Sequence, residues 1–143
     1  MNLRLSGLAA ALAISPAAAY AQTPAAAPEP STATVLQTIE RTNADQQILL
    51  PQGPVQVVIS RVTILAGAGL PVHKHLFPRY AQVVKGRLRV DDPDTGLSRE
   101  FKPGDFIVEA LDRWHSGTAL GGEPVELLVI DQVRPGEPNT IRR

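Results

Sequence analysis

The chain has 143 residues and carries 14 Lys and Arg against 14 Asp and Glu, so its formal net charge is zero. This balance gives no reason to expect a nucleic acid or an anionic membrane surface as a partner. The sequence contains no cysteine, which excludes disulfide bonds, a thiol nucleophile and thiolate metal ligands, so a folded domain must depend on core burial alone.

The first 21 residues have the pattern of a secretory signal peptide. A short positive start containing Arg4 precedes an apolar stretch from Leu8 to Ile14, and Ala19-Tyr20-Ala21 is a small-x-small cleavage pattern. The apolar stretch is too short to span a membrane. We therefore predict that residues 1–21 are removed and that the protein is exported, to the periplasm; the alternative is a retained N-terminal helix.

Residues 22–33 are rich in proline and alanine and predict an extended or disordered tether. From residue 34 to 143 the pattern is that of one domain made of short β runs. The first is Thr34–Ile39, and the long run Val55–Leu65 changes phase near Ser60, which predicts a β-bulge. Further β runs cover 83–84, 86–90, 98–101, 106–108 and 125–130. No segment keeps a helical period, so we predict an all-β sandwich or barrel.

Two of the three histidines are spaced for a shared site. His73 and His75 are two residues apart, so on an extended strand both imidazoles face the same side. The third, His115, lies about forty residues later and comes within reach if another strand crosses a small barrel. Three neutral imidazoles suit a divalent transition metal and leave a coordination position open. The alternative is a surface pair on a polar strand face.

The spacing of these residues resembles the two sequence motifs of the cupin family. The matching positions are Gly67, His73, His75 and Gly86 in the first motif and Gly104 and His115 in the second. The resemblance covers roughly residues 55–131 and is closest to small, exported, single-domain cupins of type 2. It implies the cupin double-stranded β-helix, a jelly-roll-type barrel, with the three histidines as metal ligands.

Other motif positions depart from the family pattern. Arg79 stands where the family has a glutamate ligand, and the Pro, Gly and Asn positions of the second motif hold Ala110, Asp112 and Ala119. A guanidinium cannot replace a carboxylate ligand, so three neutral donors would leave a site of full +2 charge that attracts anions. Arg79 either anchors a carboxylate or phosphate of a substrate or turns to solvent.

Three further residues near the motifs are candidates for chemistry. Glu109 and Asp112 precede His115, and either could be a general base, a hydrogen-bond acceptor for an imidazole, or a fourth ligand. The hydroxyl of Tyr80 could contact bound oxygen or substrate. For each of them the alternative is structural: a solvated carboxylate at a strand end, or a tyrosine ring packed at the rim.

These observations predict a metal-binding cupin of the cell envelope that holds one Fe, Mn, Zn, Ni or Cu ion per chain. It is either an oxygenase or lyase acting on a small organic anion or a non-catalytic module that binds a metal or a small ligand. A third possibility is a barrel whose histidines bind nothing. The family resemblance also implies a homodimer, in which segments near Thr34 and at 137–141 could be exchanged.

Overall fold

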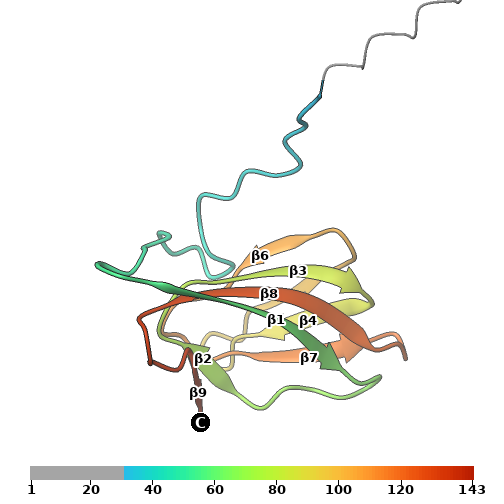
Figure 1. The fold of residues 1–143 in the computed structure, drawn as a ribbon. Helices are drawn as coiled ribbons and strands as arrows, with labels where there is room; N and C mark the ends of the chain where they lie inside the picture. The colour runs from blue at the N-terminus through green and yellow to red at the C-terminus, as the bar shows by residue number, and fades with distance from the viewer. Residues whose placement is uncertain (1–30) are drawn as a thin grey trace, which may run out of the picture. The chain divides into compact units, whose positions relative to one another are not determined.

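The computed structural model describes residues 31–143 (Figure 1). The predicted signal peptide and residues 22–30 of the predicted tether lie outside the described residues. Contacts between residues define a compact unit, Val35–Arg143. Within residues 31–143 there is no helix that could cross a membrane. The strands of this unit are β1 (Gln56–Ile64), β2 (His73–His75), β3 (Arg79–Lys85), β4 (Arg87–Asp91), β5 (Ser98–Phe101), β6 (Phe106–Val108), β7 (Ser116–Leu120), β8 (Val125–Val133) and β9 (Thr140–Arg142).

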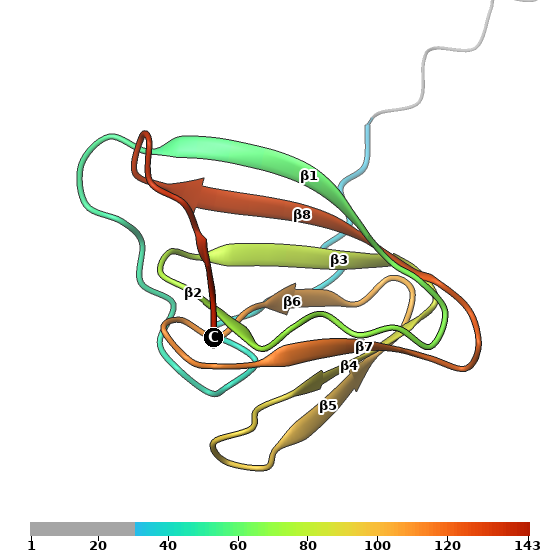
Figure 2. The ribbon, with the colours of Figure 1, turned by 90° about the horizontal axis from the view of Figure 1, so that it is seen from below.

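The strands form two facing layers (Figure 2). The prediction of an all-β sandwich or barrel is therefore confirmed. One layer is a four-stranded antiparallel sheet in the order β1-β8-β3-β6. The other contains the three-stranded sheet β5-β4-β7 and the β2-β9 pair. Main-chain hydrogen bonds between His73 and His115 connect β2 to the residue that precedes β7. Residues from distant parts of the sequence therefore meet between the layers.

The space between the layers is filled by every second residue of the strands. In β8, Val125, Leu127, Val129, Asp131 and Val133 are buried and alternate with more exposed neighbours. This period of two is the ordinary consequence of the pleat, which sends successive side chains to opposite faces. The largest group of buried apolar residues consists of Ile64, Ala81, Val83, Leu88, Ile107, Ala119, Val125, Leu127 and Val129.

Two sequence predictions about strands are wrong. Residues 34–39 form no strand, because they have no pairing partner within the described chain, and Val35 and Leu36 are 81% exposed. β1 pairs with β8 in unbroken register from Gln56 to Ile64, so there is no bulge at Ser60. The change of phase has another cause: Val57 and Ile59 point outward, so both faces of the strand carry apolar residues.

The turn between β3 and β4 requires a glycine. Gly86 has a φ of +75°, and a Cβ atom built on it would lie 2.3 Å from the carbonyl oxygen of Pro124. A side chain is excluded both by the left-handed backbone and by the close approach of the second chain segment. This glycine of the first motif therefore fixes the exit of the strand that begins with Arg79.

Candidate metal centre

The three histidines converge between the layers. His73 and His75 are buried, with Lys74 between them pointing outward, as alternation on β2 requires. The nitrogen of His73 donates to the carbonyl of His115 at 2.9 Å, and the nitrogen of His115 donates back at 2.8 Å. The three ring centroids lie 4.5 to 5.0 Å apart. The two sequence motifs are thus joined directly through the backbone of their histidines.

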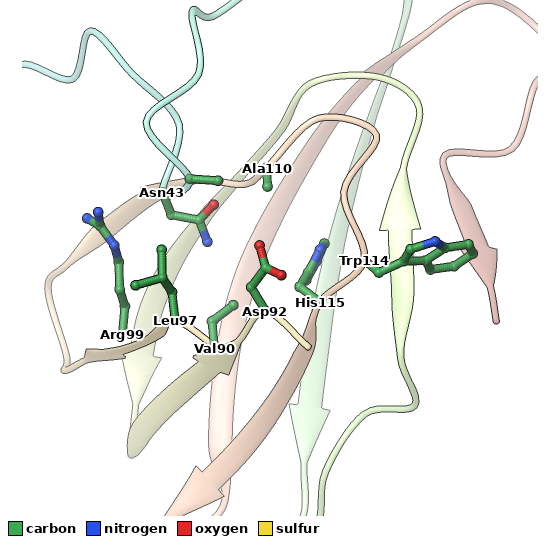
Figure 3. A pocket seen from close by; sticks show the side chains of 9 residues that line it. Asn43, Val90, Asp92, Leu97, Arg99, Ala110, Trp114 and His115 are labelled. Carbon is green, nitrogen blue, oxygen red and sulfur yellow. The ribbon is translucent and has the colours of Figure 1, made fainter. Parts of the chain in front are cut away.

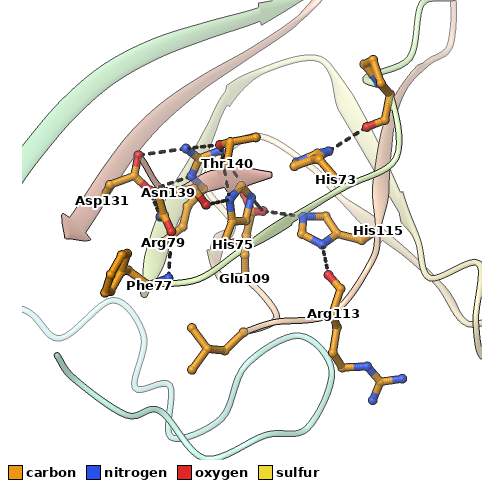
Figure 4. A network of polar contacts seen from close by, with 12 residues as sticks. His73, His75, Phe77, Arg79, Glu109, Arg113, His115, Asp131, Asn139 and Thr140 are labelled. Atoms are coloured by element: carbon orange, nitrogen blue, oxygen red, sulfur yellow. Dashed lines mark hydrogen bonds and ion pairs between the residues drawn. The ribbon is translucent and has the colours of Figure 1, made fainter. Parts of the chain in front are cut away.

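A carboxylate completes the cluster (Figure 4). Glu109 directly follows β6, and its Oε2 lies 3.0 Å from Nε2 of both His75 and His115. One donor atom from each of the four residues lies within 4.8 Å of the other three. The expectation of three neutral donors alone is therefore incomplete. Asp112, the other acidic candidate, is exposed instead, and it forms an ion pair with Lys74 at 2.6 Å.

Backbone carbonyl groups fix the orientation of the three imidazoles. Nδ1 of His73 lies 2.8 Å from the carbonyl oxygen of Pro71, and Nδ1 of His115 lies 2.9 Å from that of Arg113. Nδ1 of His75 lies 3.3 Å from the carbonyl oxygen of Asn139. Each contact is a hydrogen bond when Nδ1 carries the proton, and this arrangement turns Nε2 toward the centre. Metal-binding histidines are held in this way, so the donor set fits a transition metal.

The ionisation of the cluster follows from burial and from the shared carboxylate. Burial lowers the pKa of His73 to about 4, so this ring is neutral at physiological pH. Burial acts to raise the pKa of Glu109, but hydrogen bonds from His115 and His75 outweigh it and lower that pKa. Burial acts to lower the pKa of His115, and its hydrogen bond to Glu109 raises it instead. A metal ion at this centre therefore competes with a proton on His115.

Arg79 points inward, so the expectation that it turns to solvent is wrong. It starts β3 directly opposite Asp131 of β8, with which it forms two hydrogen bonds: Nε to Oδ1 at 2.7 Å and Nη2 to Oδ2 at 2.8 Å. Its third nitrogen, Nη1, lies 3.4 Å from Nε2 of His75. Burial acts to lower the pKa of Arg79, but the hydrogen bonds to Asp131 raise it. Asp131 was not among the residues predicted from the sequence, although it falls in the buried phase of β8.

Tyr80 lies on the opposite face of β3 from Arg79. Its hydroxyl donates to Oε1 of Gln132 at 3.1 Å, and its ring borders an apolar groove that also contains Phe106. Adjacent residues of a strand face opposite ways, so a tyrosine next to an inward-pointing Arg79 cannot reach the cluster. Tyr80 therefore lies outside the cluster, on the outer face of the sheet.

The free space beside the cluster is small. A cavity of about 30 Å³ is bordered by His73, Arg79, Glu109 and His115 together with apolar residues of the core. About 15 Å³ of such volume holds one water molecule, so this cavity has room for about two. A second pocket of about 30 Å³ is bordered by His115 and Val90, which also border the first, and by Asn43, Asp92 and Arg99 (Figure 3).

No protein-family model matches the sequence, and no curated protein matches it. Solved structures, in contrast, match the fold of this chain. The polyketide cyclase RemF from Streptomyces resistomycificus aligns with a TM-score of 0.51 and 23% identity, over 65% of this chain and 68% of its own. An oxalate oxidase in complex with glycolate aligns with a TM-score of 0.50 and 24% identity, over 60% of this chain and 45% of its own.

The cupin domain of Schizosaccharomyces pombe Cnp3 aligns with a TM-score of 0.50 and 18% identity, over 59% of this chain and 61% of its own. This chain spans less than half the length of the oxidase. These structural neighbours are cupin-fold proteins, so the predicted cupin fold is confirmed.

Proposed function

We propose that this cupin-fold chain binds one divalent transition metal through Nε2 of His73, His75 and His115 and a carboxylate oxygen of Glu109. The observation that carries the proposal is the convergence of these four donor atoms within 4.8 Å. Imidazole and carboxylate donors suit Fe, Mn, Zn, Ni and Cu, and the sequence does not select among them. When bound, such an ion supplies Lewis-acid or oxygen-activating chemistry.

The proposed activity is that of an oxygenase or lyase on a small organic anion. Arg79 supports it, because Asp131 holds two nitrogens of its guanidinium and leaves Nη1 facing the cluster. An anion beside the cluster would accept a hydrogen bond from that nitrogen. The oxalate oxidase of the same fold has been captured with glycolate, a small carboxylate. In this proposal Glu109 is a metal ligand, and Arg79 binds the substrate.

The alternative is a non-catalytic module that binds a metal or a small ligand. The size of the cavity favours this alternative, because about 30 Å³ holds two water molecules but no organic acid. A substrate would have to displace core side chains such as Leu70 or Leu88, which border the same cavity. The proposed enzyme therefore needs local movement that the binding module does not need.

Two measurements test these proposals in sequence. Protein purified without a His-tag is loaded with Fe, Mn, Zn, Ni or Cu, and we expect about one ion per chain for at least one metal. A content well below one for all five metals rejects both proposals. Oxygen consumption and product formation are then followed over a panel of small acids, phenols and thiols. Turnover supports the enzyme, and its absence across the panel supports the binding module.

We also propose that the protein is exported to the periplasm of the cell envelope, from the signal-peptide pattern of residues 1–21. Mass spectrometry of the protein recovered from the producing cell tests this proposal. A mature chain that begins at Gln22 supports it, and a chain that keeps residues 1–21 rejects it.

A homodimer is the proposed assembly. The outer face of the sheet β1-β8-β3-β6 is unusually apolar: Val57, Ile59, Leu128 and Phe106 are 53%, 67%, 41% and 37% exposed. β1 is an edge strand whose first five residues, 56–60, carry no charge, so nothing there opposes pairing with a second copy. Light scattering should give twice the mass of one chain, and Ile59→Lys should reduce it to one. A wild-type mass of one chain rejects the dimer.

A further inference from the structure

We infer that residues Asn139–Arg143 form a strap that orients the metal ligands, and that Asn139 is a positioning residue for His75. The role of the strap in metal binding rests on the proposed function. Its effect on the imidazole of His75 does not, because the contacts that produce this effect lie within the chain itself. No functional residue was predicted in this segment from the sequence, where residues 137–141 were expected only to be exchanged between subunits.

The strap runs along the strand that carries two of the histidines. β9 pairs with β2 so that Thr140 lies opposite His75 and Arg142 opposite His73. Main-chain hydrogen bonds extend the pairing at both ends. The nitrogen of Leu76 donates to the carbonyl of Asn139 at 3.3 Å, and the nitrogen of Arg143 donates to the carbonyl of Val72 at 3.0 Å. A strand of three residues is short, so β2 depends on this partner for its position.

Asn139 connects the strap to both sides of the site (Figure 4). Asn139 is 7% exposed, and its side chain accepts a hydrogen bond from the nitrogen of Phe77 at 2.8 Å and donates one to Oδ1 of Asp131 at 2.6 Å. These two bonds help to fix the position of its own carbonyl group, which lies 3.3 Å from Nδ1 of His75. The side chain of Asn139 thereby helps to orient the ring of His75.

Two neighbouring contacts add to the same arrangement. The hydroxyl of Thr140 accepts from Nη2 of Arg79 at 3.3 Å, which links the strap to the guanidinium beside the cluster. The guanidinium of Arg143 lies over the ring of Trp114, 5.6 Å from the ring centroid. Trp114 is the residue directly before His115. The strap therefore contacts β2, β3 and the segment before β7, which together supply His73, His75, Arg79 and His115.

The consequence is a fixed orientation of the His75 ring. With Nδ1 held at the carbonyl of Asn139, Nε2 faces the centre, 3.0 Å from Oε2 of Glu109, where a metal would bind it. Without the side chain of Asn139, this carbonyl is held less firmly and the ring is free to turn. Loss of such a supporting hydrogen bond lowers metal affinity by about 10- to 100-fold.

The test compares three variants with the wild type: Asn139→Ala, deletion of residues 139–143, and Glu137→Ala as the matched control, because Glu137 lies just before the strap and is exposed. The first readout is the orientation of the His75 ring in metal-free protein, from NMR contacts between its ring protons and neighbouring side chains. The second is titration with Co²⁺, whose absorption spectrum reports both affinity and ligand geometry.

We expect one fixed orientation of the His75 ring in the wild type and in Glu137→Ala, and its loss in the other two variants. Co²⁺ affinity should fall about tenfold in Asn139→Ala and further in the deletion. A wild-type His75 ring without one fixed orientation overturns the inference, even if neither of these two variants folds. Unchanged affinity and an unchanged ring orientation in folded Asn139→Ala also overturn it. A wild type that binds no metal but whose His75 ring loses its orientation in Asn139→Ala rejects the proposed function and keeps the strap.

Discussion

The interior of the domain has an apolar end and a polar end, and the same strands build both. Along β3 the inward side chains run from Val83 and Ala81 to Arg79, and along β8 they run from Val125 to Asp131. The pleat that directs a valine into the core thus directs a charged residue into the site two or four residues away on the same strand. Backbone geometry sets the direction of these side chains, and the choice of residue sets what each end does.

The two ends are stabilised in different ways. At the apolar end, burial of side chains such as Leu127 favours folding roughly in proportion to the area removed from water. At the polar end, each buried charge has a hydrogen-bonded partner, and within residues 31–143 only Oδ1 of Asn43 is a buried side-chain atom without one. Buried ion pairs contribute little net stability. The polar end therefore indicates a function other than holding the fold.

The sharpest test of this difference is Ile64→Ala at the apolar end, where Ile64 lies opposite Val125 in the register of β1 and β8. Ile64 is 2% exposed, so we expect the free energy of unfolding to fall by about 3 kcal/mol, from lost burial and the cavity left behind. The affinity of the folded protein for Co²⁺ should stay within threefold of the wild type. Urea denaturation and metal titration measure the two quantities. A large loss of affinity in the folded variant would mean that the two ends are not separable.

The polar end should make the stability of the metal-free protein depend on pH. The pKa of His73 is about 4 in the folded state and near 6.5 when unfolded, so the unfolded chain binds the extra proton between these values. Stability therefore falls by roughly 2 kcal/mol as the pH is lowered from 6.5 to 4.5. His115 has a raised pKa in the folded state, so its contribution to stability is fully present below pH 6.5 and decreases only at higher pH.

The contribution of Glu109 to stability stays nearly constant between pH 6.5 and 4.5. Its folded pKa is lowered, so its contribution is complete above its ordinary value and is lost only at more acidic pH. Denaturation of chelator-treated protein from pH 6.5 to 4.5 measures the slope, with His73→Gln as the control in which the slope should largely vanish. An equal slope in both proteins contradicts the assignment to His73.

His75→Ala tests the polar end by affinity. We expect affinity for Co²⁺ to fall at least tenfold, about 1.4 kcal/mol, because a ligand is lost, while the β-sheet circular dichroism stays unchanged. Calorimetric or spectroscopic titration measures the affinity. Unchanged affinity would show that this imidazole does not bind the metal.

The smallest effect is expected from Lys74→Ala, on the outward side of β2. The ammonium of Lys74 pairs with Asp112 at 2.6 Å, but the Asp112 side chain is 65% exposed, so the pair contributes less than about 1 kcal/mol. Metal affinity should not change, because Lys74 faces away from the cluster. A tenfold change would mean that both faces of β2 serve the site.

The sequence contained the parts of this arrangement that depend on local spacing. The pair at 73 and 75, the turn at Gly86 and the all-β class follow from alternation and from glycine positions. The inward direction of Arg79 could not be read in the same way, because it depends on Asp131, 52 residues later and in a strand whose register was unknown. Asn139 was missed for the same reason: its contacts to His75 and Phe77 join segments more than sixty residues apart.

The paired main-chain hydrogen bonds between His73 and His115 have a consequence for the proposed metal site, namely for what happens when an ion is removed from it. They bring the segments of His73 and His115 together without a cation. Folding of the metal-free chain therefore already includes the entropic cost of closing the loop between these two residues. A chelator should therefore strip the ion and leave an intact barrel, unlike small zinc modules that unfold when emptied. Reloading should then be as fast as water and proton exchange allow, with no refolding step.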